Sequence, residues 1–276
     1  MKYGIREICD VVLKAKSAVK VGNKTFNKGE PVIYFDSLKT STMEGAATTV
    51  YAQGGRGNSR LVAWEGERTV TFTMEDALIS EMGLAVLTGA GIINAADTAI
   101  NVHTTAKAPV VGGKATLTLA ADDTPSTEAG ADIYAIEMDE YDNVLATTKV
   151  TSLSNYQVTN TENAKVVLFD FYVTRSAGAT QIEITADKFA GNYYLEASTL
   201  FRSADGVDHP AEFIIPNCKI QSNFTFTMAS SGDPSTFTFT MDAFPDYTKF
   251  DYTKKVLSVI QVLDESAPAA DIDQGE

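Results

Sequence analysis

Histidine and cysteine, which supply many of the nucleophiles, bases and transition-metal ligands of proteins, are scarce in this sequence. The chain has two of each among 276 residues. Neither cysteine has a second Cys or His at metal-ligand spacing, and no Gly-x-Ser-x-Gly elbow is present. The sequence therefore predicts no catalytic residue, no metal site and no cofactor. We expect Cys9 and Cys218 to be reduced packing residues, with a disulfide between them as the open alternative.

Long apolar runs are missing as well. No stretch approaches the roughly 18 residues that a membrane helix needs, so no membrane-spanning segment is predicted. The first residues, MKYGIREICDVVLKAK, place charged side chains among the apolar ones and lack the unbroken apolar centre of a secretory signal. We expect the protein to begin in the cytosol where it is made.

Basic residues are outnumbered by acidic ones, 22 against 36, which gives a formal charge of −14. The last thirteen residues, 264–276, hold five acids and no base, so that −14 minus −5 leaves −9 on the body of the chain. We expect this acidic tail to be disordered, because its residues are too polar and too small to form a packed core. The negative body argues against a protein that wraps nucleic acid, which requires a basic surface.

What the sequence does contain is strand patterning. It divides the chain into a core region, over 1–106 and 187–263, and a more turn-rich β elaboration over 107–186. Residues 37–60 within the core region are small and polar and include GGRGNSR. That segment is predicted to be a long loop, and compact domains seldom contain such loops without a function for them.

A single helix is predicted over 75–87. Thr73 is its expected N-cap, Asp76 occupies the capping-box position and Gly89 ends the run. Apolar residues at spacings of three and four, Leu78, Met82, Ala85 and Val86, form one stripe, and we expect that stripe to cover a sheet.

Three near-identical hexads recur at distant places: TVTFTM (69–74), NFTFTM (223–228) and TFTFTM (236–241). In each, alternate positions carry apolar side chains while Thr or Asn occupies the others, which predicts strands with one buried and one polar face. The second and third hexads are separated by ASSGDPS, whose turn chemistry predicts a hairpin between them.

Two blocks resemble the tail tube proteins of bacteriophages, especially those with contractile tails. The first, 68–92, is similar to that family's strand leading into its single helix. The second, 184–244, is similar to its terminal block, with a Gly-Tyr-Tyr strand, an Ile-Ile-Pro segment and a hairpin with Gly-Asp-Pro at its turn. The matching positions are Gly191, Tyr193, Ile215, Pro216, Lys219, Gly232, Asp233 and Pro234.

The resemblance implies a mainly β fold: two packed antiparallel sheets, sandwich- or barrel-like, flanked by one helix. It implies a structural protein rather than an enzyme, assembled in the host cytoplasm into hexameric rings that stack as the virion's tail tube. Implied partners are the sheath, tape-measure, baseplate and tail terminator proteins, with DNA passing transiently through the tube.

The resemblance also places a long early loop at the contact between rings. Within 37–60, the side chains best able to bury area or to reach acids on a neighbour are Met43, Tyr51, Arg56 and Arg60. Three other interpretations stay open: the inner tube of a related injection machine, a capsid decoration or other virion surface protein, and a glycan-binding β-sandwich. The single Trp64 and the absence of a recognisable signal weigh against the last.

Overall fold

The computed structural model describes residues 2–120, 123–228, 230–232 and 235–263. The chain forms two compact units. The first comprises 1–92 and 182–276, and the second comprises 93–181. The predicted acidic tail, 264–276, lies outside the described residues.

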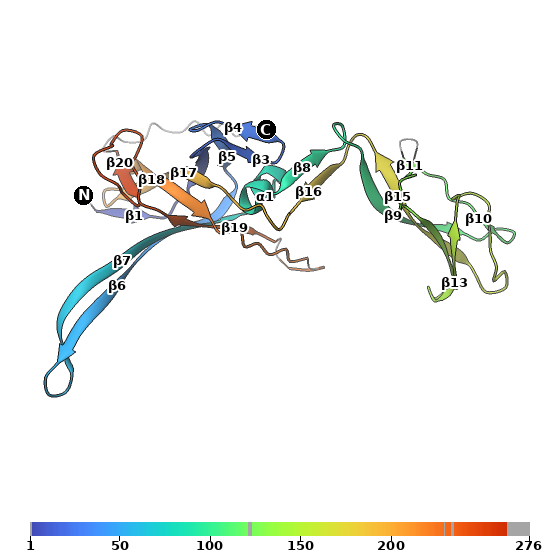
Figure 1. The fold of residues 1–276 in the computed structure, drawn as a ribbon, viewed down its shortest axis with the longest axis horizontal. Coiled ribbons are helices and arrows are strands. Elements are labelled where there is room, and N and C mark those ends of the chain that lie inside the picture. Colours follow the sequence, from blue (N-terminus) through green and yellow to red (C-terminus); the bar gives the residue numbers. More distant parts are fainter. Residues whose placement is uncertain (1, 121–122, 229, 233–234, 264–276) are drawn as a thin grey trace. The chain divides into compact units, whose positions relative to one another are not determined.

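The first unit is built on a nine-stranded sheet in the order β5-β2-β17-β18-β19-β7-β6, with β1 added to β17 and β20 added to β18 (Figure 1). β3 and β4 form a small ribbon. The elements are β1 (Tyr3–Ile5), β2 (Asp10–Ala15), β3 (Val19–Val21), β4 (Lys24–Phe26), β5 (Pro31–Phe35), β6 (Leu38–Gly54), β7 (Ser59–Asp76), α1 (Glu81–Thr88), β17 (Asn192–Ser203), β18 (Asp208–Ile220), β19 (Phe237–Ala243) and β20 (Val259–Val262).

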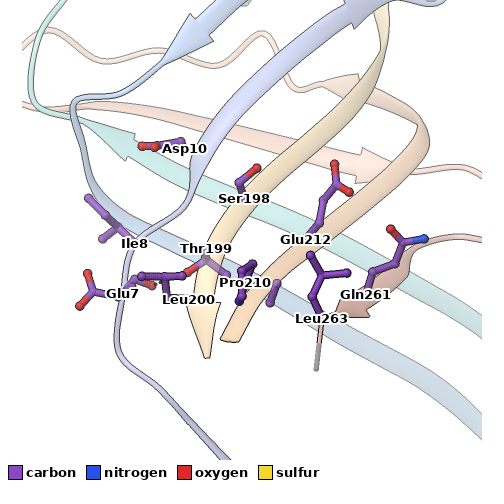
Figure 2. A pocket seen from close by; sticks show the side chains of 11 residues that line it. Glu7, Ile8, Asp10, Ser198, Thr199, Leu200, Pro210, Glu212, Gln261 and Leu263 are labelled. Carbon is purple, nitrogen blue, oxygen red and sulfur yellow. Dashed lines mark hydrogen bonds between the residues drawn. The ribbon is translucent and has the colours of Figure 1, made fainter. Parts of the chain in front are cut away.

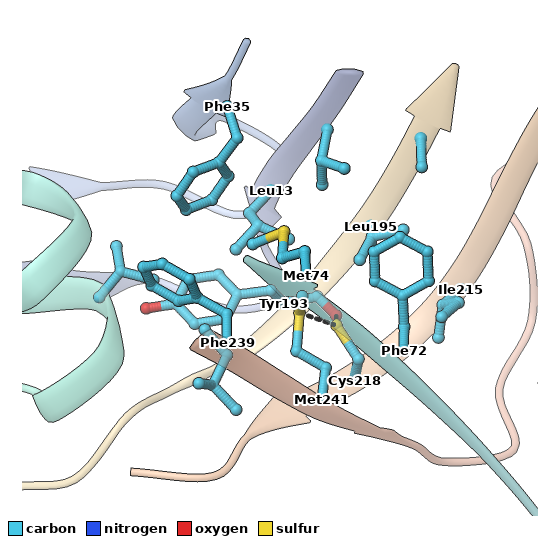
Figure 3. Packing of buried hydrophobic residues seen from close by; sticks show 14 of the residues in the cluster. Leu13, Phe35, Phe72, Met74, Tyr193, Leu195, Ile215, Cys218, Phe239 and Met241 are labelled. Atoms are coloured by element: carbon cyan, nitrogen blue, oxygen red, sulfur yellow. Dashed lines mark hydrogen bonds between the residues drawn. The ribbon is translucent and has the colours of Figure 1, made fainter. Parts of the chain in front are cut away.

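The large sheet curves back over itself. β5 and β19 are separated by three strands in the sheet order, which in a flat sheet would place them about 19 Å apart at about 4.8 Å per strand. The rings of Phe35 and Phe239, one from each strand, are nevertheless only 4.9 Å apart. Two layers of one continuous sheet therefore enclose the core, whose side chains Figure 3 shows. The predicted mainly β, antiparallel fold with one helix is confirmed.

Both cysteines are buried free thiols, as their patterning predicts. The Cys218 Sγ lies 3.4 Å from the carbonyl oxygen of Tyr193 and 3.9 Å from the Met241 Sδ (Figure 3). Burial raises the pKa of Cys218 to about 12, so this thiol stays protonated and packs as an apolar group.

The helix is shorter than predicted and begins later. β7 continues to Asp76, and the helix begins only at Glu81, with Ser80 as its N-cap, whose hydroxyl accepts a hydrogen bond from the Gly83 N–H at 2.9 Å. The predicted N-cap Thr73 lies within the strand because its neighbours pair with β19 and β6. Gly89 does end the helix, in the left-handed conformation with φ 72°.

The prediction of a long loop over 37–60 is wrong. Residues Leu38–Gly54 form β6, which pairs with β7 almost throughout. Beyond the body of the sheet both faces of this hairpin are exposed, so the sequence has no reason to alternate there between apolar and polar residues. Without that alternation the patterning of a strand cannot be recognised.

The second unit has its own five-stranded sheet, in which β15 pairs with β9 on one side and with β12 and β11 on the other, and β13 follows β12. Its elements are β9 (Ile100–Pro109), β10 (Lys114–Ala115), β11 (Thr124–Pro125), β12 (Ile133–Met138), β13 (Val144–Val150), β14 (Tyr156–Gln157) and β15 (Val166–Arg175). A separate core, centred on Phe169 and Phe171, fills it.

The boundaries of this unit differ from the predicted 107–186. β9 pairs with β15 along its whole length, so the inserted unit begins before residue 107. Where the chain enters and leaves the insertion, β8 (Gly91–Asn94) and β16 (Thr180–Glu183) pair as a two-stranded ribbon.

Candidate assembly surfaces

The β6–β7 hairpin projects from the sheet of the first unit (Figure 1). In its turn Gly55, Gly57 and Asn58 have positive φ angles of 78°, 90° and 48°. Glycine and asparagine adopt this left-handed region at a lower energetic cost than other residues. The Asn58 N–H closes the turn on the Gly55 carbonyl at 3.2 Å. From Glu44 to Arg68 nearly every side chain is exposed, so this part of the hairpin has no core in the free subunit.

The outer part of the hairpin nevertheless carries apolar side chains. Val50 pairs with Trp64 and Ala52 with Val62, which places these four on one face of the ribbon. Val50, Val62 and Trp64 are 62%, 49% and 56% exposed. Exposed apolar residues gathered in one place are typical of a surface that another protein covers.

The four residues predicted as contact side chains lie at different heights of this hairpin. Met43 sits at its base, opposite Phe72, and packs partly against the core. Tyr51 and Arg60 lie together near the end, with the guanidinium carbon 4.0 Å from the centre of the ring, and Arg56 is exposed in the turn. The structure thus brings together only Tyr51 and Arg60.

Sequence reasoning missed the apolar face of Val50, Val62 and Trp64. The run LVAW (61–64) pairs with a segment for which the sequence predicts a loop. Only the pairing of Val50 with Trp64 shows that the two segments present one surface.

A second surface lies on three neighbouring strands, β6, β7 and β19. Their register sets nine side chains in three rows of three, which we call the threonine face. The rows are Thr40–Glu75–Thr238, Thr42–Thr73–Thr240 and Glu44–Thr71–Asp242. All nine are exposed or half-buried.

The opposite face of the same strands is buried, with Phe72, Met74, Phe239 and Met241 at 0–2% exposure. The first and third hexads pair directly, so that Thr73 faces Thr240 and Met74 faces Phe239. Two of the three predicted one-sided strands, the first and third hexads, are therefore present. The threonine face has three acids and no base, and Lys219 of β18, opposite Asp242, adds one positive charge beside it.

A groove of about 600 Å³ crosses β17 and β18 near β20 (Figure 2). Leu200, Pro210 and Leu263 supply apolar lining, and Glu7, Asp10 and Glu212 supply carboxylates. Partial burial and the nearby Glu196 raise the pKa of Glu212. The groove is therefore acidic.

Glu196 of β17 is the centre of a small ion cluster. It accepts a hydrogen bond from Lys14 and another from Lys249, the latter at 2.8 Å. Burial acts to raise the pKa of Glu196, but these two ammonium groups outweigh it and hold that pKa below its usual range. The cluster ties the segment around Lys249 to the sheet.

Among the described residues, no three His, Cys, Asp or Glu side chains are placed to hold a metal ion. In the same part of the chain no helix has the length and apolar character needed to cross a membrane.

A comparison with family models matches residues 5–256 to the YomU/Tube protein family. A comparison with curated proteins finds no match. Because the family match extends over most of the sequence, the chain belongs to the YomU/Tube family. The resemblance to phage tail tube proteins is confirmed, and the protein is a structural component of a phage tail.

Proposed function

We propose that this member of the YomU/Tube family assembles into hexameric rings that stack into a tail tube through which DNA leaves the virion. The observation that carries the proposal is the combination, in one sheet, of a threonine face and a hairpin whose outer part is unburied. A closed ring that also stacks needs two distinct contact surfaces per copy, and a conduit needs a wetted wall.

The threonine face is proposed as the wall of the channel. Threonine hydroxyls hold water without adding charge. The three acids of the threonine face and the neighbouring Lys219 of β18 together carry a net charge of −2 per copy. Fixed cations would bind each passing phosphate and release its counterions, which adds affinity and slows passage. A weakly negative wall repels DNA over about 8–10 Å at physiological salt.

The hairpin is proposed as the contact between rings. Two-stranded ribbons are marginally stable alone, and this one exposes a tryptophan, two valines and an Arg–Tyr pair at its end. Met43, Tyr51, Arg56 and Arg60 remain the proposed contact side chains, joined by Val50, Val62 and Trp64. Buried aromatic and arginine side chains commonly dominate such contacts.

Assembly in the host cytoplasm and contacts with sheath, tape-measure, baseplate and terminator proteins are part of this proposal. An injection-machine tube with a different cargo is the second candidate, since the same threonine face suits other cargo. Enzymatic activity is not part of either.

Negative-stain microscopy of the purified protein over a range of concentrations tests the proposal. We expect rings with sixfold symmetry, and tubes at high concentration. A stable monomer at every concentration, together with virions whose tubes lack this protein, would refute it.

The channel wall has its own test. Changing Glu75 and Asp242 to lysine makes the net charge of the threonine face and Lys219 together positive without altering the buried face. We expect intact tubes that eject DNA more slowly, most of all at low salt. Unchanged ejection at low salt would place the wall elsewhere.

A further inference from the structure

The second hexad, NFTFTM at 223–228, is a strand by sequence but not in the structure. β18 ends at Ile220, and residues 221–228 follow without strand pairing. The predicted hairpin with β19 therefore forms only at its base, where Ile220 pairs with Met241 and the Gln221 N–H reaches the Thr240 carbonyl at 2.8 Å.

The segment lies beside β19 but out of register with it. Continuing the pairing of Lys219 with Asp242 and Ile220 with Met241 would set Phe224 opposite Phe237. Instead the ring of Phe226 packs on Phe237, with centroids 4.9 Å apart. A cavity of about 500 Å³ lies between residues 221–227 and 235–240, and β19 has no strand partner there on its β18 side within the described residues.

The side chains of the segment fit the missing strand. In the continued register Gln221 and Asn223 fall beside Thr240 and Thr238, and they extend the threonine face by one column. Phe224, Phe226 and Met228 then fall on the face of the buried Ile220. In the free subunit these three are 39%, 44% and 90% exposed.

At the other end of the same layer, β6 has a free edge. Among the described residues it pairs with β7 alone. Lysine and proline commonly protect an exposed edge from pairing. β6 has one lysine, Lys39, next to its first residue, and from there to its end at Gly54 it has no lysine or proline and one charged side chain, Glu44. A long unprotected edge is a template for another strand.

Strand direction shows which strand fits that edge. β6, β7 and β19 alternate in direction, and rotation about a ring axis preserves direction. With three strands per copy, β19 would meet the neighbour's β6 in parallel. With a fourth strand, running opposite to β19, every pairing in the ring is antiparallel, and antiparallel pairing is the slightly more stable per residue.

We propose that residues 221–228 become a strand on assembly, bonded on one edge to their own β19 and on the other to β6 of the neighbouring copy. This rests on the proposed ring. The segment is the part of the subunit that completes the channel wall, and it orders only when a second copy supplies the edge.

Proline at Thr225 tests the proposal, because proline removes a backbone N–H and disrupts a central strand. Thr225→Ala is the matched control, since it keeps the N–H. We expect the Thr225→Pro subunit to melt at the wild-type temperature yet form no rings, while Thr225→Ala forms tubes like the wild type. Normal rings from Thr225→Pro would overturn the inference and leave the tube proposal intact, whereas a wild type that never assembles would overturn the tube proposal.

Crosslinking gives the second measurement. Cysteine at Thr225, combined in turn with cysteine at Thr42, Ala46 and Thr48 of β6, should yield disulfide-linked ladders between copies in assembled protein for at least one pair. The two native thiols are buried, and the wild-type protein therefore measures the background level of crosslinking. Ladders from none of the pairs in assembled rings would show that another strand covers the β6 edge.

Discussion

The outer hairpin and the inserted unit are both built of antiparallel strands, yet their stability has different sources. The inserted unit has a core of its own, with Val167, Phe169 and Phe171 fully buried. The hairpin beyond Glu44 has two exposed faces and an unburied Trp64. A β segment that buries its apolar residues internally is a domain, whereas one that exposes them depends on a partner.

A buried carboxylate sharpens the contrast. Glu137 of the inserted unit is fully buried, and its Oε1 accepts hydrogen bonds from the Tyr156 hydroxyl at 2.8 Å and from the Thr159 N–H at 2.6 Å. The Asn160 N–H donates to its Oε2 at 2.9 Å. Such a satisfied polar network specifies one packing arrangement, and no residue of the outer hairpin is held in a comparable way among the described contacts.

The largest expected effect comes from removing the outer hairpin. Replacing residues 48–67 by Asn-Gly joins the paired residues Ala47 and Arg68 by a two-residue turn. We expect a folded subunit with an unchanged melting temperature that no longer stacks, as measured by microscopy and calorimetry. The control replaces only 55–58 by Asn-Gly, which keeps both strands, and it should still form tubes. Tubes of normal length from the shortened variant would show that the rings make contact elsewhere.

A core substitution should affect the inserted unit alone. Phe169→Ala removes a fully buried ring and should cost about 3–5 kcal/mol of that unit's stability. Hydrogen exchange should show lost protection in β12 and β15 with β2 and β17 unaffected. Tyr141→Ala, at a residue 76% exposed, is the control and should stay within about 0.5 kcal/mol of the wild type. Equal loss of protection in both units would mean that they unfold together.

Glu137→Gln should have a smaller, pH-dependent effect. In either orientation the glutamine NH2 faces another donor, the Asn160 N–H or the N–H and hydroxyl of Thr159. We therefore expect a loss of about 1–3 kcal/mol at pH 7. Burial acts to raise the pKa of Glu137, but its hydrogen bonds outweigh burial and lower it. A lowered folded-state pKa contributes stability that is fully present above the unfolded value, about 4.3, and is lost as the pH falls through the folded value.

Urea unfolding of wild type and Glu137→Gln between pH 7 and pH 3 measures this difference, which should shrink toward the acid end. Glu162→Gln changes an exposed carboxylate of the same unit and should leave the pH profile as it is. A constant difference between wild type and Glu137→Gln over this range would mean that the pKa of Glu137 is the same in the folded and unfolded states.

The smallest expected effect is at the end of the hairpin. The Arg60–Tyr51 stack is solvent-exposed, and such pairs contribute about 0.5–1 kcal/mol. A double-mutant cycle of Arg60→Ala and Tyr51→Leu, read from hydrogen exchange of the hairpin amides, should give a coupling of that size. Additive effects of the two substitutions would mean that the ring and guanidinium do not interact in solution.

Residue pattern alone predicted the mainly β class, the one-sided strands and the end of the helix at Gly89. These follow from local rules: alternate burial at Phe72 and Met74, and a glycine where the backbone turns left-handed. The start of the helix and the extent of β6 did not follow, because pairing with β19 and β7 overrode the local preferences of Thr73 and of 38–54.

The sequence by itself determined which side is buried in the strands that alternate, such as those around Phe72 and Phe239, since period-2 alternation is a property of neighbouring residues. Only the tertiary structure decided which strands lie beside one another. It set Thr42, Thr73 and Thr240 in one row and placed Val50 opposite Trp64. Register between segments distant in sequence depends on packing of the whole sheet, and both the threonine face and the apolar hairpin exist only once that register is formed.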